Sequence, residues 1–446
     1  MRRLLYFPII LATCATLSTP LHAQGLRDDI NQLFIFGNGD DPLFLAGSGS
    51  NPSQAIAIHG SHFEPSAVSQ NGTMIDFLTN AIGGNVADFP FSAASGGTTF
   101  KFENGVPVAT STSAGPVFAE RGQTLGRGRV LVGLSYDTFH YSSIRGVDLH
   151  NINLVFTHQN VTGAKCDSIF GTSCDPMGVP SFENDIMPFQ LSLDIKTSVE
   201  SFVLTYGVSD RLDIGVAIPM VSTSLVGQST ATIIPFGGDS AYHYFAGTPS
   251  NPVLSASRFV QGSATGIGDV AVRAKLNIHN SDRSSVALLV DGRFPTGSQD
   301  DLLGAGKFSG RALAVISGSF GAFSPHADVG YLRRAGNYRN DAILATFGFD
   351  HLMSTGVTLD ADMIAQFQVG DSKLLIPQSV TYTEPFQRTV NTSDIPNIRD
   401  DLINGSLGAK FTLRGGMTLI ANVIVPLNRG GLRANELYTV GLEYGF

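Results

Sequence analysis

Apolar and polar side chains alternate strictly in many segments between Arg129 and the C-terminus. In the last segment one face carries Tyr438, Val440, Leu442, Tyr444 and Phe446, and the other carries Leu437, Thr439, Gly441, Glu443 and Gly445. Successive side chains of a β-strand point to opposite faces, so this pattern predicts strands with one apolar face. A chain that ends inside such a strand must pair its last backbone groups with another strand. The alternation therefore limits the chain to amphipathic sheets, in a sandwich or in a closed barrel.

The lengths of the connections distinguish these two architectures. Short connections at 414–416, 351–356, 320–323, 280–283 and 209–211 alternate with longer ones at 370–399, 334–340, 297–306, 228–265 and 161–187. Outer-membrane barrels have short periplasmic turns and longer external loops, whereas a Greek-key sandwich has no reason to keep this order. We therefore predict an all-β protein, a transmembrane antiparallel up-and-down β-barrel.

The number of strands follows from the positions of the two chain ends. Thirteen alternating segments follow Arg129, but a barrel with both ends in the periplasm needs an even number. Residues 98–112 offer a further strand, because Asn104-Gly105 is a strong hairpin signal between two apolar alternations. We predict about fourteen strands, with twelve as the alternative, and expect residues 438–446 to pair with a strand inside 98–112.

The N-terminus has the composition of a secretory signal. Arg2 and Arg3 precede an apolar stretch, and a cleavage site before Gln24 is plausible for this pattern. A lipoprotein signal ending at Cys14 is an alternative that fits its motif less well. We expect three parts: a signal peptide at 1–23, a plug or periplasmic segment at 24–97, and an outer-membrane barrel at 98–446.

Composition and charge agree with a barrel in the outer membrane. The chain has 50 glycines, only 15% charged residues and a net charge of −9, and no long apolar run. A negative chain is a poor partner for nucleic acid. We expect contact with outer-membrane lipid and lipopolysaccharide, and recognition of the terminal Phe446 by the barrel-assembly machinery.

Residues 24–97 do not resemble barrel wall. One helix stands out, because Met74, Phe77, Leu78, Ala81 and Ile82 follow the helical spacing and Gly83-Gly84 can end it. So short a helix is marginal alone and needs a surface to dock on. We favour a plug inside the lumen over a periplasmic extension that packs on itself.

Two cysteines remain after the signal peptide is removed. Cys166 and Cys174 lie close together in one predicted external loop, in an oxidising compartment, and we expect a disulfide. A zinc pair is the weaker alternative, because no third ligand lies nearby at ligand spacing. His59 and His62 also lack a third ligand. We expect no cofactor and no metal site.

Charged residues of both signs fall at positions expected to face the lumen. The predicted charge ladder contains Asp269, Arg273, Lys275, Asp291, Arg293 and Asp328, and Asp194, Lys196 and Glu200 are also expected to face inward. Mixed charges pair across neighbouring strands and stiffen a wall or hold a plug, whereas a selective pore concentrates one sign.

The strand around Glu200, Ser201 and Phe202 changes its apolar parity. Residues 191–199 are apolar at odd positions, and residues 202–206 are apolar at even positions. This change predicts a β-bulge or kink in the wall. It is either an ordinary bulge or a local gap through which an apolar solute leaves sideways into the membrane.

Catalysis is not expected. His140, His150, His158 and His326 lie on candidate strands, but no nucleophile motif such as Gly-x-Ser-x-Gly accompanies them.

Several motifs resemble a family of outer-membrane porins named after the meta-pathway of phenol degradation. They are GIGDVAVRAK at 266–275, DGRFPTG at 291–297, TYGVSDRLDIG at 205–215, SPHADVGY at 324–331 and FAERGQTLGRGR at 118–129. The resemblance implies a barrel of the same type as channels for hydrophobic compounds and long-chain fatty acids. Its expected function is passive uptake of small hydrophobic or aromatic compounds. The alternative is a structural or adhesive barrel whose loops 161–187, 228–265 and 370–399 bind a partner.

Overall fold

A computed structural model shows how the chain folds. It describes residues 25–36, 43–44, 76–85, 100–103, 106–109, 113–157, 185–236, 245–248, 251–336, 339–376, 378–382, 386–413 and 416–446. The predicted signal peptide, Met74, Cys166 and Cys174 lie outside these residues. Among the described residues, no helix is long and apolar enough to cross a membrane.

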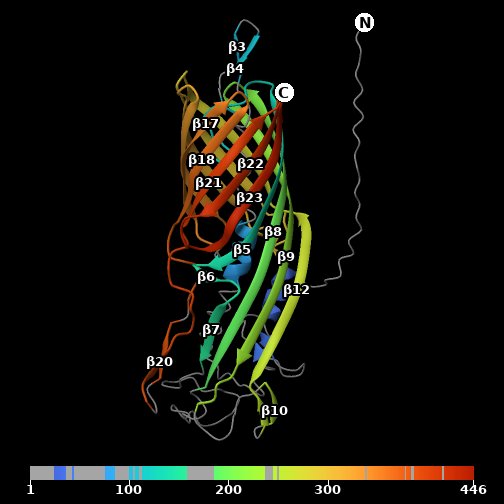
Figure 1. The fold of residues 1–446 in the computed structure, drawn as a ribbon, viewed down its shortest axis with the longest axis vertical. Helices are drawn as coiled ribbons and strands as arrows, with labels where there is room; N and C mark the ends of the chain where they lie inside the picture. Colours follow the sequence, from blue (N-terminus) through green and yellow to red (C-terminus); the bar gives the residue numbers. More distant parts are fainter. Residues whose placement is uncertain are drawn as a thin grey trace, which may run out of the picture.

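Twelve long antiparallel strands form a closed barrel (Figure 1). The wall consists of β5 (Val130–Ile144), β8 (Ile186–Ser209), β9 (Leu212–Thr232), β13 (Val270–Asn280), β14 (Ser284–Phe294), β15 (Ser309–Gly318), β16 (Phe323–Arg334), β17 (Ala342–Ser354), β18 (Val357–Gln368), β21 (Leu402–Thr412), β22 (Met417–Pro426) and β23 (Leu432–Gly445). Each pairs with the next and β23 pairs with β5, so the predicted barrel is confirmed with the alternative count of twelve.

The other described elements lie outside this wall. They are α1 (Leu26–Gln32), a second helix at 76–85, β1 (Ile35–Phe36), β2 (Leu43–Phe44), β3 (Phe100–Glu103), β4 (Val106–Ala109), β6 (Val147–Asp148), β7 (Ile152–Thr157), β10 (Ala246–Thr248), β11 (Asn251–Val253), β12 (Ser255–Ile267), β19 (Val380–Tyr382) and β20 (Arg388–Val390). The helix at 76–85 includes both glycines that were expected to end it.

The barrel closes between its first and last wall strands. Val130 donates a backbone hydrogen bond to the Phe446 carbonyl, and Phe446 donates one to the Val130 carbonyl, both at 2.9 Å. The predicted partner within 98–112 is wrong, because β3 and β4 pair with each other as a separate hairpin. The count of fourteen is also wrong. The predicted count includes the alternating segment β7 as a wall strand, but it pairs with the external part of β8 and is not part of the wall. Without it the wall has twelve strands, which is already an even number.

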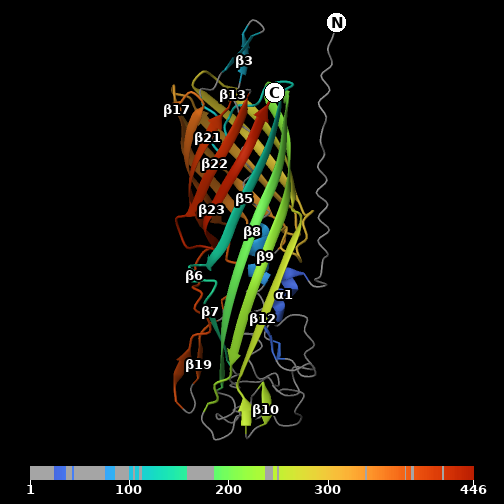
Figure 2. The same cartoon turned by 45° about the vertical axis from the view of Figure 1, so that its right-hand side comes forward.

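The five predicted short connections join wall strands at the end of the barrel where the C-terminus lies (Figure 1). We call this the periplasmic end, and the opposite end, with the long connections, the external end. Strands β8, β9 and β12 continue well beyond the barrel at the external end (Figure 2). With β7 they form a sheet that we call the external sheet.

No bulge interrupts the wall at Glu200, Ser201 and Phe202. β8 pairs with β5 and with β9 in continuous register across Val199–Val203. The predicted kink and lateral gap at this point are therefore wrong. Even-numbered residues point outward along the whole of β8, and odd-numbered residues point inward.

The parity of the apolar residues changes because the surroundings of β8 change. Before Glu200 the outward face lies beyond the membrane and is polar, so Asp194 and Lys196 face outward. The prediction that Asp194, Lys196 and Glu200 face the lumen is therefore wrong. From Phe202 onward the outward face is apolar and meets lipid. Cross-strand neighbours of Glu200 are Tyr136 and Met220, which mark the same external edge of the apolar band on β5 and β9.

The inward face of the external sheet is covered by α1. Phe34 stacks on Phe189 with ring centroids 4.7 Å apart, and Ser229 Oγ donates to the Leu33 carbonyl at 2.6 Å. Glycines at 227 and 262 allow this approach, because a Cβ at either position would lie within 2.6 Å of an α1-region atom. The apolar odd positions of β8 are thus buried by protein, not by lipid.

Candidate functional site

Residues 113–125, which we call the floor segment, cross the lumen near the periplasmic end. Backbone groups of the segment are bound by wall side chains: Ala114 N donates to Thr358 Oγ1 at 3.0 Å and Gly122 N donates to Ser317 Oγ at 3.0 Å. Leu125 N donates to Asp213 Oδ2 at 2.9 Å. Since the side chains of residues 113–122 are buried, the segment fills this level of the barrel.

Glu120 joins the floor segment to the predicted charge ladder. Its carboxylate lies 3.0 Å from Arg273 Nη1 and 3.8 Å from Lys275 Nζ, and its backbone N–H donates to Asp328 at 3.0 Å. All of these groups are buried. Opposite charges at such distances compensate each other's loss of hydration, which single buried charges cannot do.

The rest of the ladder meets at Asp291. Its carboxylate lies 3.4 Å from Arg273, 3.3 Å from Arg293 and 3.4 Å from Arg311 on three successive strands. Asp269 does not join this group. It accepts hydrogen bonds from the backbone of Gly297 and Ala305, and so holds the external connection 297–306.

A second ion pair ties the floor segment to the other side of the wall. Arg121 Nη2 lies 2.5 Å from Asp350 Oδ2, and Ser113 Oγ also donates to this carboxylate. His326 lies beside it, with Nε2 2.7 Å from Asp362 Oδ1. The floor is therefore bound by ionised side chains from both halves of the barrel.

The helix at 76–85 lies at the external mouth of the lumen. Tyr141 Oη donates to the Ile82 carbonyl at 3.4 Å, Gln299 donates to Asn80 Oδ1 at 2.7 Å, and Asn85 donates to the Leu432 carbonyl at 3.4 Å. Phe77, Leu78, Ala81 and Ile82, the predicted apolar face, are all buried.

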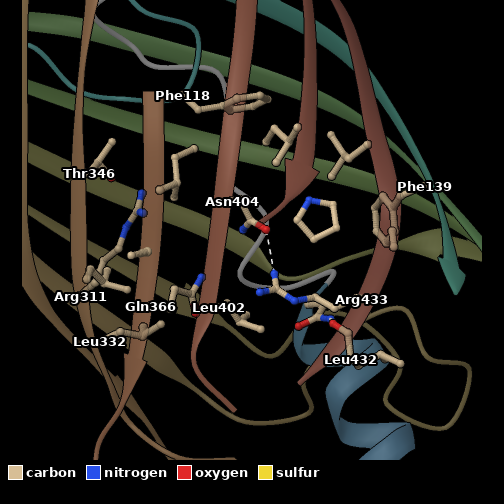
Figure 3. A pocket seen from close by; sticks show the side chains of 18 of the residues that line it. Phe118, Phe139, Arg311, Leu332, Thr346, Gln366, Leu402, Asn404, Leu432 and Arg433 are labelled. Atoms are coloured by element: carbon tan, nitrogen blue, oxygen red, sulfur yellow. Dashed lines mark hydrogen bonds between the residues drawn. The ribbon is translucent and has the colours of Figure 1, made fainter. Parts of the chain in front are cut away.

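Between this helix and the floor segment lies a cavity of about 190 Å³ (Figure 3). Most of its lining is apolar: Phe118, Phe139, Tyr141, Leu313, Leu332, Leu344, Ile364, Ala365, Leu402, Ile424, Pro426, Leu432, Ala434 and Leu437. Polar and charged lining residues are Asn85, Glu120, Arg293, Arg311, Asp328, Arg339, Thr346, Gln366, Asn404, Arg433 and Glu436. An apolar chamber inside a lumen differs from the water-filled polar channel of a general porin.

Arg433 extends from β23 across this chamber toward Asn404 (Figure 3). Its side chain is buried, with 6% of the residue exposed. Nη1 donates to Asn404 Oδ1 at 2.7 Å, and Nη2 donates to Asn428 Oδ1 and, at 3.4 Å, to the Ile403 carbonyl. These acceptors are neutral, and Nε has no hydrogen-bond partner within the described part of the chain. The guanidinium can therefore donate a further hydrogen bond to an oxygen of a bound solute.

At the external rim, Asp341 holds the connection between β16 and β17. Burial alone would raise its pKa, but hydrogen bonds from the Arg334 backbone, from Arg333 at 2.5 Å and from Tyr331 Oη at 2.7 Å hold the pKa below its usual value. Asp341 thus remains ionised at neutral pH and keeps this connection at the mouth.

Sequence reasoning placed most of the ladder in the lumen but missed the residues that define the chamber. Glu120 and Arg121 belong to the 118–129 motif, whose position just before the first wall strand was their one available signal. Arg433 precedes an irregularity at 434–437, where β23 loses its regular register with β5. The alternation of the last strand therefore did not extend to it.

Among proteins of known structure, this chain is similar to several outer-membrane channels. A channel from Pseudomonas putida F1 is 12% identical, with a TM-score of 0.41 over 73% of this chain and 98% of that one. A Pseudomonas aeruginosa FadL homologue is 12% identical, with a TM-score of 0.33 over 72% and 90%. The P. putida toluene transporter TodX is 8% identical, with a TM-score of 0.30 over 71% and 89%. With values this low, these likenesses do not transfer a function to this chain.

The comparison with curated proteins gives no match. A family model described as "Putative MetA-pathway of phenol degradation" matches residues 187–422. The match covers 236 of the 446 residues and runs from the start of β8 into β22. The chain belongs to this family of the MetA-pathway of phenol degradation.

Proposed function

We propose that the protein is a passive outer-membrane channel for small hydrophobic or aromatic compounds, and that the chamber is its solute-binding site. The observation that carries this proposal is the mostly apolar lining of a cavity inside the lumen. An apolar cavity of roughly 150 Å³ in another protein is large enough to bind benzene. The 190 Å³ chamber is thus suited to a single aromatic ring.

Arg433 would orient a ring that carries an oxygen substituent. Its guanidinium meets neutral amide and carbonyl oxygens, so a hydroxyl or carboxylate oxygen of the solute would complete its hydrogen bonding. The apolar side chains would hold the ring itself by burial of its surface.

The helix at 76–85 and the floor segment would control access to the chamber from its two ends. We therefore propose that residues 24–97 act as a plug at the external mouth. Passage requires binding that is favourable enough for the solute to enter and weak enough for it to leave.

Solute flux into liposomes containing the purified protein tests this function. We expect flux of phenol and toluene to exceed that of a polar solute of similar size. Leu344→Trp would fill the chamber, and an overpacking cost of about 1–3 kcal/mol corresponds to binding that is about 5- to 150-fold weaker. Ile343→Trp is the matched control, because its side chain points outward to lipid. Aromatic flux that is absent in the wild type, or equal in the two variants, would overturn the proposal.

A further inference from the structure

Two histidines and an aspartate converge on the outward face of the external part of the barrel. His140 lies on β5, Asp194 lies on β8, and His150 lies in the turn between β6 and β7. One ligand atom from each side chain lies within 4.8 Å of the other two. The His140 Nε2 and Asp194 Oδ1 atoms are 2.8 Å apart.

We propose that His140, His150 and Asp194 bind a divalent transition-metal ion such as Zn²⁺ or Cu²⁺. Two imidazoles and one carboxylate are a donor set that suits these ions, whereas Mg²⁺ and Ca²⁺ prefer sites made of oxygen ligands. The ligands come from three separate segments, so a bound ion would connect β5, β8 and the turn at 149–151 to one another.

Asp148 supports this assignment independently. Its Oδ1 lies 3.0 Å from His150 Nδ1 and also accepts the His150 backbone N–H at 2.9 Å. A carboxylate on one ring nitrogen fixes the tautomer that leaves the other nitrogen free to bind a metal, which is the usual arrangement around metal-binding histidines. Here the free atom is Nε2.

The surroundings of the site leave room for an ion and its water ligands. A hollow on the outer surface is lined by residues of β5, the following turn and β23: His140, Tyr141, Ser142, Ser143, Gly146, Asp148, His150, Asn435 and Glu436. His140 and His150 are both exposed, and His140 lies beyond the Tyr136–Glu200 edge of the apolar band. An ion from the aqueous phase can therefore reach them.

Charged residues around the site both favour and oppose the binding of a cation. Asp148 and Glu436 are negative and favour a cation, whereas Lys196 Nζ lies 3.4 Å from Asp194 Oδ2 and competes with the ion for this carboxylate. The backbone position of the turn is set independently, because Leu193 N donates to the Leu149 carbonyl at 2.8 Å. The ligands on β8 and in the turn are therefore close together before an ion binds.

The test uses the whole mature protein, folded in detergent without lipopolysaccharide and purified without a polyhistidine tag, since both bind metal ions. Calorimetric titration with ZnCl₂ should show one saturable site per chain. With CuCl₂, electron paramagnetic resonance should show two coordinated imidazoles. His150→Gln should reduce the two imidazoles to one, and Asp194→Asn should abolish the saturable Zn²⁺ site.

Three further variants make the assignment specific. Asp148→Asn should weaken Zn²⁺ binding about 10- to 100-fold through the orientation of His150. Lys196→Gln should strengthen binding, because it removes the competing cation. His279→Gln, an exposed histidine at the periplasmic end, is the matched control and should change nothing.

Heat-modified mobility on gels checks that each variant has folded. The proposal is overturned if the folded wild type shows no saturable Zn²⁺ binding. It is equally overturned if folded His140→Gln and His150→Gln variants bind Zn²⁺ as the wild type does.

Discussion

At the scale of single residues, Arg433 is the most unusual side chain of the chamber. A buried guanidinium normally faces a carboxylate, because burial removes its hydration. Here its described acceptors are two amide oxygens and one carbonyl. The guanidinium therefore keeps hydrogen-bonding capacity for a guest molecule inside a mostly apolar chamber.

Arg433→Met should discriminate between solutes. A hydrogen bond to a charged group contributes about 1.5–3 kcal/mol, so phenol flux should fall at least about tenfold while toluene flux stays nearly constant. Parallel liposome assays with both solutes measure this ratio. Arg211→Met is the control, because that residue is exposed in the periplasmic turn between β8 and β9, far from the chamber. Equal changes for phenol and toluene would show that Arg433 does not contact the solute.

Glu120→Gln should destabilise the barrel. The substitution removes the negative charge that lies between Arg273 and Lys275. Breaking a buried ion pair costs about 3–5 kcal/mol, because an uncompensated charge remains. Reversible urea unfolding in lipid vesicles measures the change. Glu436→Gln, at an exposed position, should leave the free energy of unfolding unchanged, and a similar loss in both variants would contradict this account.

At the scale of elements, the floor segment is a short non-helical stretch held by wall side chains. Replacing Phe118 by Gly and Arg121 by Ala should loosen it, since the first change removes buried apolar surface and the second breaks the pair with Asp350. Single-channel conductance in planar bilayers should rise. The exposed Arg127→Ala, at the end of the same motif, should leave the conductance unchanged. An unaltered conductance in the double variant would mean that other residues close the lumen.

The lipid-facing part of β8 can be tested against its external part. Leu204→Arg should disfavour insertion by about 2–4 kcal/mol if Leu204 lies near the middle of the bilayer. Ser198→Arg lies on the same face of β8, six residues away and outside the apolar band, and should not change the free energy of insertion measurably. The folded fraction after refolding into vesicles reports both. If both arginines were tolerated equally, the membrane edge at Tyr136, Glu200 and Met220 would be misplaced.

A strand could be predicted from the sequence where each of its two faces has the same surroundings, lipid or lumen, along its whole length. The alternation and the connection lengths were enough for the wall strands and for the end at which Phe446 lies. They failed for β8, because its two faces exchange polarity where the strand leaves the membrane. A single strand with two surroundings has the same pattern in sequence as a strand with a bulge.

At the scale of the whole molecule, the chamber could not be predicted because its lining comes from many parts of the chain. Phe118, Leu332 and Arg433 are far apart in sequence and line one cavity in the closed barrel (Figure 3). The alternation predicts whether a side chain points to the lumen or to lipid. It does not predict which distant segments lie at the same height in the lumen. The family resemblance correctly indicated the class of barrel and carried no information about these contacts.

Deletion of residues 24–97 should leave the wall intact, because the described wall strands all lie within 130–445. It should expose the inward face of the external sheet, where Phe189, Leu191 and Leu193 are now buried. We therefore expect an unchanged heat-modified gel shift, increased binding of an apolar fluorescent dye, and faster solute flux. Failure of the shortened chain to form a barrel would show that this region is required for folding.

The hydrogen bonds between Val130 and Phe446 have a consequence for the order of events in biogenesis. The wall closes between β5 and β23, its first and last strands in chain order, so the cylinder cannot be finished before β23 has been exported. The floor segment precedes the first wall strand, yet it is enclosed by strands that follow it. We therefore expect the segment to be in position while the sheet is still open, with the nascent wall wrapping around it before the seam is joined.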